Sequence, residues 1–373
     1  MIPPAARRSD AIDLLRAVAV LGTLFHHTLF AYTNPKIWSV QVGGHQFFPF
    51  LFGNGWLGVN LFFILSGFVL YRPMIATDSA SIWRYYIHRA WRLWPLLFLF
   101  TFFFSFAQSG SAMKATGEAL FSCSGLNNLL PAQWFPRLGA TWSLGVEILF
   151  SLLLPGLIIL QQRLGFWRIS WAILIFCLVY RASADALWFR LHPDWGNPLI
   201  NPLKDNILGR LDDFVIGMMA ARLCAEGGLL RARMRLFPAL VVLAATSYGW
   251  NYVFVSPRSL TLSVLVSVLH LSFSLSSLVV IYRLYLAAWT ESPWLKPMVV
   301  VGQMCYSIYL TQALVRNMSN PALDLLNPGQ AFEFLLITFG FSFFCFVMIE
   351  ARGLKRRPTW LARFEPFRGE SKV

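Results

Sequence analysis

The sequence contains few charged residues, and acidic residues are especially scarce. Only 13% of its 373 residues are charged, with 17 Asp and Glu against 31 Lys and Arg. By contrast, 57% of the residues are hydrophobic and the mean hydropathy is +0.58. This composition excludes an ordinary soluble enzyme and a disordered chain. It is typical of a protein that is surrounded by lipid.

Motifs of several soluble enzyme classes are also missing. The chain has no Walker phosphate loop, no HExxH zinc motif and no GxSxG nucleophile elbow, so it shows no sign of the chemistry that depends on them. Its five cysteines lack metal-ligand spacing, which favours apolar packing and predicts neither a metal site nor a disulfide framework. We find no repeat, low-complexity tract or linker, and therefore expect one membrane domain over 1–373, with a basic tail at 351–373.

Ten apolar stretches approach the length of about 20 residues that crosses a bilayer as a helix. They predict an all-α, polytopic membrane protein with about ten transmembrane helices. The predicted spans are 12–33, 54–71, 93–108, 141–160, 169–188, 206–224, 237–255, 261–282, 298–316 and 332–350.

The net charge of +14 resembles that of a nucleic-acid-binding protein until the cations are placed between the spans. With the N-terminus inside, most Lys and Arg residues fall in segments on that same side, and the tail at 351–373 adds to them. This asymmetry follows the positive-inside rule and predicts cytoplasmic termini in a bacterial inner membrane. The excess charge then indicates contact with anionic lipid and no nucleic-acid partner.

Two polar residues stand out in the first span, Arg16 and His27. Eleven residues make about three helical turns, so the two side chains share one helix face roughly 16 Å apart. Charged groups inside a membrane are costly and usually mark function. The alternative is that Arg16 extends to the cytoplasmic interface and that His27 makes an ordinary contact between helices.

Polar groups in other spans are predicted to lie at a similar depth to His27. Assuming a rise of ~1.5 Å per residue and an apolar core of about 30 Å, His27 lies about 8 Å below the outer boundary. By the same arithmetic Glu147 and Gln312 lie about 9 Å below it, and Asp212 and Asp213 are similarly shallow. This layer predicts a through-membrane cavity with a reaction centre near the outer face. Arg210, on the same helix as the two aspartates, is expected to pair with Asp213.

Cationic and aromatic residues meet in the segment before the third span. Arg89 and Arg92 stand among aromatic side chains there, a composition that suits either a phosphorylated ligand or an interfacial belt that faces lipid phosphates. In the second span, small residues are expected to let helices approach closely. They are Gly55, Gly58, Ser66 and Gly67.

Five motifs, in order along the chain, resemble those of the acyltransferase-3 family of membrane acyltransferases. They are Arg16 followed by His27, Phe62-Phe63-Ile64-Leu65-Ser66-Gly67-Phe68, Arg89 with Arg92, Trp142-Ser143-Leu144-Gly145-Val146-Glu147, and Tyr306-Ser307-Ile308-Tyr309-Leu310. The chain departs from the family at Gln312, where many members carry histidine, which puts any second-histidine role in doubt. The resemblance implies acyl-CoA as donor, with acetyl-CoA expected, and a hydroxyl of an exported glycan or glycolipid as acceptor.

Chemistry and resemblance together predict a role for each residue. His27 is expected to act as general base or as a relay nucleophile, and Glu147 to orient its imidazole. Arg89 and Arg92, together with Arg16, are expected to bind the CoA phosphates, and Arg16 is counted with the catalytic residues as well. The residues expected to contact the substrates are Trp142, Ser143, Asp212, Asp213, Tyr306, Tyr309 and Gln312.

Two other classes of function remain open at this point. A transporter or flippase of a glycan or lipid-linked substrate also needs buried charges, although it usually shows a repeated half. A membrane scaffold without chemistry would leave the shared face of Arg16 and His27 unexplained. Under the enzyme hypothesis the partners are the acceptor glycan, membrane lipid and separate polysaccharide-biosynthesis proteins, and no metal is expected.

Overall fold

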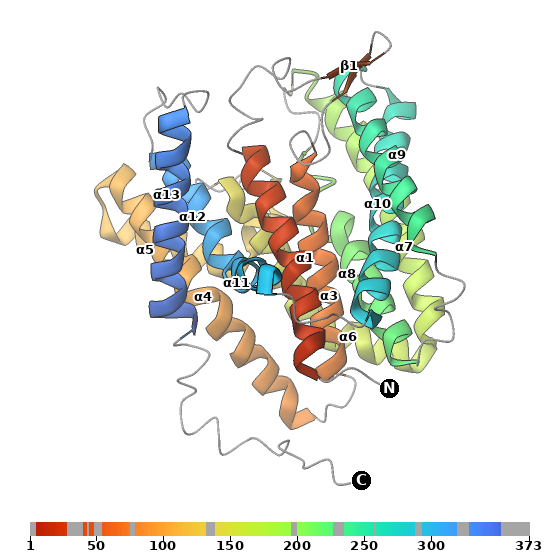
Figure 1. Cartoon of the computed structure of the whole chain (residues 1–373), viewed down its shortest axis with the longest axis horizontal. Coiled ribbons are helices and arrows are strands. Elements are labelled where there is room, and N and C mark those ends of the chain that lie inside the picture. Colours follow the sequence, from red (N-terminus) through yellow and green to blue (C-terminus); the bar gives the residue numbers. More distant parts are fainter. Residues whose placement is uncertain are drawn as a thin grey trace.

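The computed structural model describes residues 5–27, 40–42, 45–47, 54–74, 79–131, 139–194, 200–226, 235–256, 259–287, 293–318 and 328–351. Within these ranges the protein is a bundle of helices with one small hairpin (Figure 1). Of the basic tail predicted at 351–373, all but Ala351 lies outside the described residues, as do residues 28–33 of the first predicted span.

The α-helices follow one another with short connections. They are α1 (Ala5–Phe25), α3 (Gly58–Met74), α4 (Ser79–Ser109), α5 (Ala112–Ser124), α6 (Trp142–Leu164), α7 (Phe166–Leu191), α8 (Ile207–Ala225), α9 (Leu236–Val255), α10 (Leu260–Leu286), α11 (Lys296–Gln303), α12 (Cys305–Met318) and α13 (Pro328–Cys345). Single turns flank some of them: η3 (Gly55–Leu57), η4 (Leu126–Leu129), η6 (Gly139–Thr141), η7 (Pro293–Leu295) and the π-helical turn η8 (Phe346–Glu350).

Five helices of the described chain are long and apolar enough to cross a membrane. They are Ile82–Ser109, Trp142–Leu164, Phe166–Leu191, Leu260–Leu286 and Gly329–Glu350. A sixth span results if α11 and α12, which meet at 67°, are counted as one broken crossing. These six correspond to the predicted spans 93–108, 141–160, 169–188, 261–282, 332–350 and 298–316.

The other four of the ten predicted spans do not meet the same criteria. Helices α1 and α8 each contain several charged residues, and the apolar parts of α3 and α9 are shorter, at Gly55–Tyr71 and Leu236–Trp250. Apolar length therefore supports five or six crossings, and the prediction of about ten is not confirmed.

Helices α1 and α3 stand at the centre of the bundle. The α5, α12 and α13 helices lie on one side of them and α7, α9 and α10 on the other (Figure 1). Helix α1 begins and α13 ends toward the same end of the molecule, whereas the hairpin lies at the opposite end (Figure 1). The hairpin pairs β1 (Val40–Val42) antiparallel with β2 (His45–Phe47), with Gln41 opposite Gln46. The prediction of an all-α chain omitted this element.

Close contacts between helix backbones explain the small residues of α3. A Cβ atom added at Gly67 would overlap the carbonyl oxygen of Phe214 on α8, and one added at Gly217 would overlap that of Ile64. At the start of α3, Gly58 approaches α1 in the same way, and so does Gly55 in the preceding turn η3. The predicted packing role is confirmed for the three glycines, and it places α3 between α1 and α8 without intervening side chains.

Candidate functional site

One cavity brings together most of the residues that the sequence analysis selected. Its walls come from α1, α3, α4, α6 and α12, five helices that are far apart in sequence. The predicted residues in its lining are Arg16, Arg89, Arg92, Ser143, Glu147, Tyr306 and Tyr309. Apolar side chains, among them Val59, Phe62 and Val69 of α3, complete the walls. The cavity therefore combines a cationic region with an apolar one.

A buried ion pair joins α4 to α6 in the cavity wall. Arg89 donates from Nη2 to Glu147 Oε1 over 2.7 Å and from Nε to Ser151 Oγ over 3.0 Å. Ser66 of α3 donates to the same carboxylate oxygen over 3.1 Å. These contacts fix the plane of the guanidinium and use Nε and Nη2, but not Nη1. The pair thus holds Arg89 in a defined orientation at the cavity.

The two other arginines in the cavity differ from Arg89 in their partners. Arg16 donates to Asp13 Oδ1, one turn earlier on α1, over 2.8 Å. Within the described chain, Arg92 makes no hydrogen bond and has no carboxylate within 4.0 Å, although its charge interacts with those of Glu147 and Glu350. A cation that lines a cavity without a close protein partner is a suitable group for an anionic ligand.

Two tyrosines of α12 connect the cavity to neighbouring helices. Tyr309 and Ser143 share a hydrogen bond of 2.7 Å between their hydroxyls, which joins α12 to the first turn of α6. Tyr306 donates to the carbonyl oxygen of Leu93 on α4 over 2.6 Å. Both side chains are buried. The motifs that contain these residues therefore meet in space.

His27 lies outside this lining, at the end of α1. Its ring centroid is 5.6 Å from that of His26, and its side chain is only partly buried. It follows Arg16 by eleven residues, or roughly 16 Å along the helix. The expected orientation of His27 by Glu147 is not found in the described chain, because the Glu147 carboxylate binds Arg89 and Ser66.

Glu147 has its closest partners on α3 and α4, and α4 is longer than predicted. The segment with Arg89 and Arg92 was placed before the third predicted span at 93–108, but it belongs to a continuous helix from Ser79 to Ser109. Arg89 thus lies ten residues inside α4, where it meets Glu147 on α6. Glu147 is therefore level with the arginines and not with His27.

Gln312 is buried next to the same helix face, one turn beyond Tyr309. Its side chain is 1% exposed, and neither its Oε1 nor its Nε2 has a hydrogen-bond partner among the residues that the structure describes. It does not line the cavity. Its expected contact with a substrate stays a prediction.

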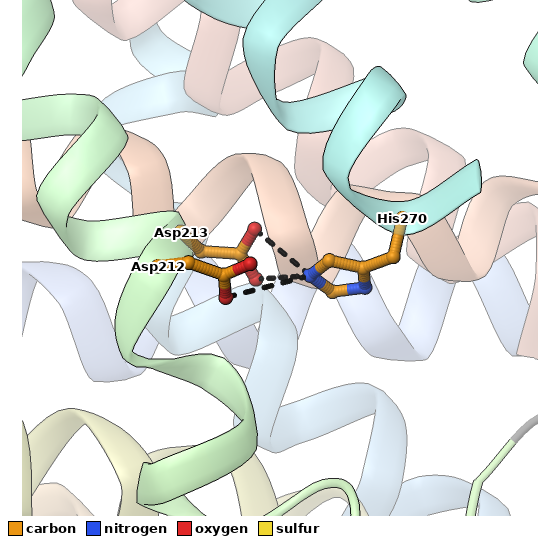
Figure 2. Close-up of side chains that lie close together, drawn as sticks. All are labelled: Asp212, Asp213 and His270. Atoms are coloured by element: carbon orange, nitrogen blue, oxygen red, sulfur yellow. Dashed lines mark hydrogen bonds and ion pairs between the residues drawn. The ribbon is translucent and has the colours of Figure 1, made fainter. Parts of the chain in front are cut away.

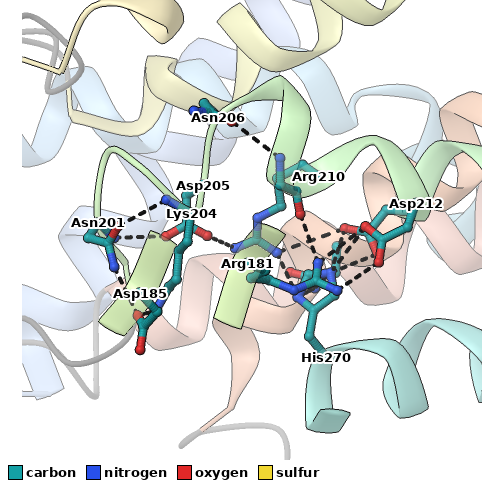
Figure 3. A network of polar contacts seen from close by, with 12 residues as sticks. Arg181, Asp185, Asn201, Lys204, Asp205, Asn206, Arg210, Asp212 and His270 are labelled. Carbon is teal, nitrogen blue, oxygen red and sulfur yellow. Dashed lines mark hydrogen bonds and ion pairs between the residues drawn. The ribbon is translucent and has the colours of Figure 1, made fainter. Parts of the chain in front are cut away.

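Asp212 and Asp213 lie away from the cavity, in a buried polar network of α7, α8 and α10 (Figures 2 and 3). Asp212 accepts from both Nη atoms of Arg181, over 3.2 and 2.7 Å. Asp213 accepts from His270 Nε2 over 3.1 Å and from Ser274. Both carboxylates therefore bind other side chains of the protein and do not line the cavity. Their expected contact with a substrate stays a prediction.

Arg210 belongs to the same network. Its Nη1 lies 3.8 Å from Asp213, as expected, but its shortest contact runs from Nη2 to Asp205. Nη1 also donates to His270 Nδ1 over 3.0 Å. Asn60 of α3 places its amide nitrogen 3.0 Å from the same ring atom. Two elements of the bundle thus bind Arg210 from opposite ends of its guanidinium.

The cluster of Asp212, Asp213 and His270 has the spacing of a metal site, since one ligand atom from each lies within 4.8 Å of the others (Figure 2). Its hydrogen bonds do not suit a cation. Arginine has no acceptor, so the bond from Arg210 requires a lone pair on His270 Nδ1. The proton of the neutral ring then sits on Nε2, the atom that faces the carboxylates. With Arg181 and Arg210 alongside, the cluster is a closed ion network.

Cysteines contribute little to the site. Cys305 lines the cavity, and Cys123 lies outside the candidate spans at the end of α5. Burial raises the pKa of the Cys123 thiol to about 12. This thiol therefore stays protonated at neutral pH and is a poor nucleophile.

Sequence reasoning missed several residues that the structure places in these two regions. Ser66 was assigned to helix packing, but its hydroxyl contacts Glu147 at the cavity. Arg181 and His270 were given no role although both are polar residues inside apolar spans. That is the same signal that selected Arg16, so it was available for both.

Apolar helices around an arginine-lined cavity define the class as a membrane protein with a polar cavity between its helices. Comparison with known families gives the class a name. The family model described as an acyltransferase domain matches residues 9–350, nearly the whole chain. The chain belongs to the acyltransferase-3 family.

Similarity to an individual curated protein covers less of the chain than the family model does. A "Regulator of hypoxia-inducible factor 1" from Caenorhabditis elegans is 22% identical over 175 residues, which cover 42% of this chain. The chain covers 35% of that protein's length. No solved structure matches the chain significantly.

Proposed function

We propose that this membrane acyltransferase transfers an acyl group, acetyl in the simplest case, from cytoplasmic acyl-CoA to a hydroxyl of an exported glycan or glycolipid. The observation that carries the proposal is the shared cavity of Arg16, Arg89 and Arg92 with Glu147. The family supplies acyl transfer as the reaction, and the cavity supplies the character of the donor.

The cavity suits a donor with anionic and apolar parts. CoA carries phosphates. The guanidinium of Arg92 makes no hydrogen bond within the described chain, and the contacts of Arg89 with Ser151 and Glu147 do not use its Nη1 atom. Arginine side chains bind phosphate through charge-assisted hydrogen bonds. The apolar walls at Phe62 and Val69 would contact the uncharged pantetheine arm. Arg16, one helix away, completes the cationic region.

His27 is the proposed base for the acceptor hydroxyl. A neutral imidazole removes the hydroxyl proton as the oxygen attacks the thioester carbonyl carbon, the C–S bond breaks, and the CoA thiolate takes up a proton. Because His27 lies beyond the cavity on the same helix as Arg16, the acyl end of the donor is proposed to extend along α1 toward it. Direct transfer and a transient acyl-histidine are both compatible with this arrangement.

Donor binding tests the proposal with the purified, full-length protein. Wild-type protein should bind acetyl-CoA, and Arg92→Ala should weaken the Kd at least about tenfold, the size expected for a lost charged hydrogen bond. Arg163→Ala is the matched control, because Arg163 is an exposed arginine outside the cavity. Isothermal titration calorimetry gives both values. Equal affinity in wild type and Arg92→Ala, or no binding by wild type, would contradict the proposed donor site.

A further inference from the structure

Arg210 connects the buried polar network to the aromatic wall of the cavity. Its guanidinium carbon lies 5.8 Å from the centroid of the Trp142 ring, within the range of a cation–π contact. Trp142 in turn meets Phe63 edge to face at 6.4 Å, and Phe63 lines the cavity. A continuous series of contacts therefore runs from the network to the ligand site.

Arg210 itself is rigidly held. Its side chain is 2% exposed, and its two Nη atoms bind different elements, Asp205 before α8 and His270 on α10 (Figure 3). His270 is fixed from its other side by Asp213. Because a planar guanidinium with both ends bound has no freedom to turn, the ring of Trp142 rests on an immobile support.

The start of α6 needs such a support. Thr141, at the N-cap, makes no side-chain hydrogen bond to the helix, and the first turn contains no acidic residue. The usual local signals that fix a helix start are therefore missing. Tertiary contacts contribute to its position, among them those of Trp142 with Arg210 and of Ser143 with Tyr309. Glu147, which holds Arg89, follows one turn later.

We propose that Arg210 is a positioning residue of the acyltransferase, which acts through Trp142 to fix the first turn of α6 and with it Ser143 and Glu147. The role in turnover rests on the proposed function. The structural part of the proposal, that Arg210 fixes the first turn of α6, is independent of the proposed function.

Two arginines of the network allow a matched experiment. Arg210→Lys keeps the charge but cannot reach both Asp205 and His270. Arg181→Lys changes an equally buried arginine that binds Asp212 and does not contact Trp142. Full-length variants in detergent are compared by hydrogen–deuterium exchange of peptides that cover 139–147. The same variants, in native membranes that carry the acceptor glycan, are compared by the release of free CoA thiol from acetyl-CoA.

Arg210→Lys should raise exchange over 139–147 at least about threefold, because the first turn opens more often. It should raise KM for acetyl-CoA at least about threefold, because a displaced Glu147 no longer holds Arg89 of the proposed donor site. Arg181→Lys should leave both the exchange of this segment and KM for acetyl-CoA within about twofold of wild type. Equal effects of the two variants would show that the network has only a structural role, and would overturn the proposal.

Trp142→Phe is a second variant that tests the same contact if the Arg210→Lys protein does not fold. It weakens the cation–π contact without touching the ion network and should raise exchange over 139–147 in the same way. Unchanged exchange in Trp142→Phe would also overturn the proposal. If wild-type protein released no CoA, the proposed function would fail, whereas the exchange data would still decide whether Arg210 positions α6.

Discussion

At the scale of single residues, the cavity contains three arginines with three different environments. Arg16 has an acidic partner on its own helix, Arg89 is held by two neighbours on α6, and Arg92 has no close partner in the described chain. These environments predict how each position responds to lysine, which keeps the charge but lacks the planar fork.

Lysine should replace Arg92 better than Arg89. Arg92→Lys should keep the Kd for acetyl-CoA within about threefold of wild type, because a charge without a fixed geometry remains at the cavity. Arg89→Lys should weaken it about tenfold, since one ammonium cannot bind Ser151 and Glu147 while also facing a phosphate. Titration of acetyl-CoA into each purified variant measures this difference. The opposite order would show that the contacts of Arg89 with Ser151 and Glu147 are unrelated to donor binding.

His27 gives the sharpest prediction for the chemical step. His27→Ala should lower acyl transfer at least about a hundredfold, the usual contribution of a general base, while acetyl-CoA affinity stays unchanged. His26→Ala is the control, because it points about 100° away around the helix and should have a smaller effect. Label transfer from acetyl-CoA to membrane glycans compares the variants. Full activity of His27→Ala would remove this residue from the mechanism.

At the scale of helices, the sequence predicted where apolar helices lie better than where they begin. The core of α4 was predicted at 93–108, but the helix starts at Ser79. The cations at Arg84, Arg89 and Arg92 lowered the hydropathy of its first half and made that half resemble a loop. The contacts that stabilise these charges come from α6, so no local pattern could have shown them.

The same reason explains the remaining errors in the predicted site. Arg16, Arg89, Glu147 and Tyr309 were selected from four separate motifs, and the structure places all four in the lining of one cavity. The pairing of Glu147 was wrong because depth along one helix does not determine which neighbouring helix supplies the partner. The bend between α11 and α12 was likewise missed inside the span predicted at 298–316, since its residues are apolar on both sides of the break.

Close packing of α3 and α8 gives a prediction at this scale. Gly217→Ala should lower the free energy of unfolding by about 1–3 kcal/mol, because its Cβ would overlap the backbone of Ile64 and push the helices apart. Gly156→Ala is the control, since no atom lies near a Cβ added there and alanine favours a helix. Reversible denaturation in mixed detergent measures both. A neutral Gly217→Ala would mean that the helices separate without cost.

At the scale of the whole molecule, the positions of the helix ends suggest that donor and acceptor reach the site from opposite faces of the membrane. The start of α1 and the end of α13 lie toward one end of the bundle, as expected if both termini are cytoplasmic (Figure 1). Arg16 lies near the middle of α1, and His27 follows the end of this helix, farther from the termini. We therefore expect the donor to enter from the cytoplasm and the acceptor to meet it near the outer face.

Sealed right-side-out vesicles from cells that express the protein test this central claim most directly. With labelled acetyl-CoA loaded in the lumen, label should appear on glycan exposed at the outer surface, and vesicles that contain His27→Ala should show none. Labelled acetyl-CoA supplied only outside should give no transfer. Transfer from external acetyl-CoA to an external acceptor, without any donor in the lumen, would contradict both the topology and the proposed path of the acyl group.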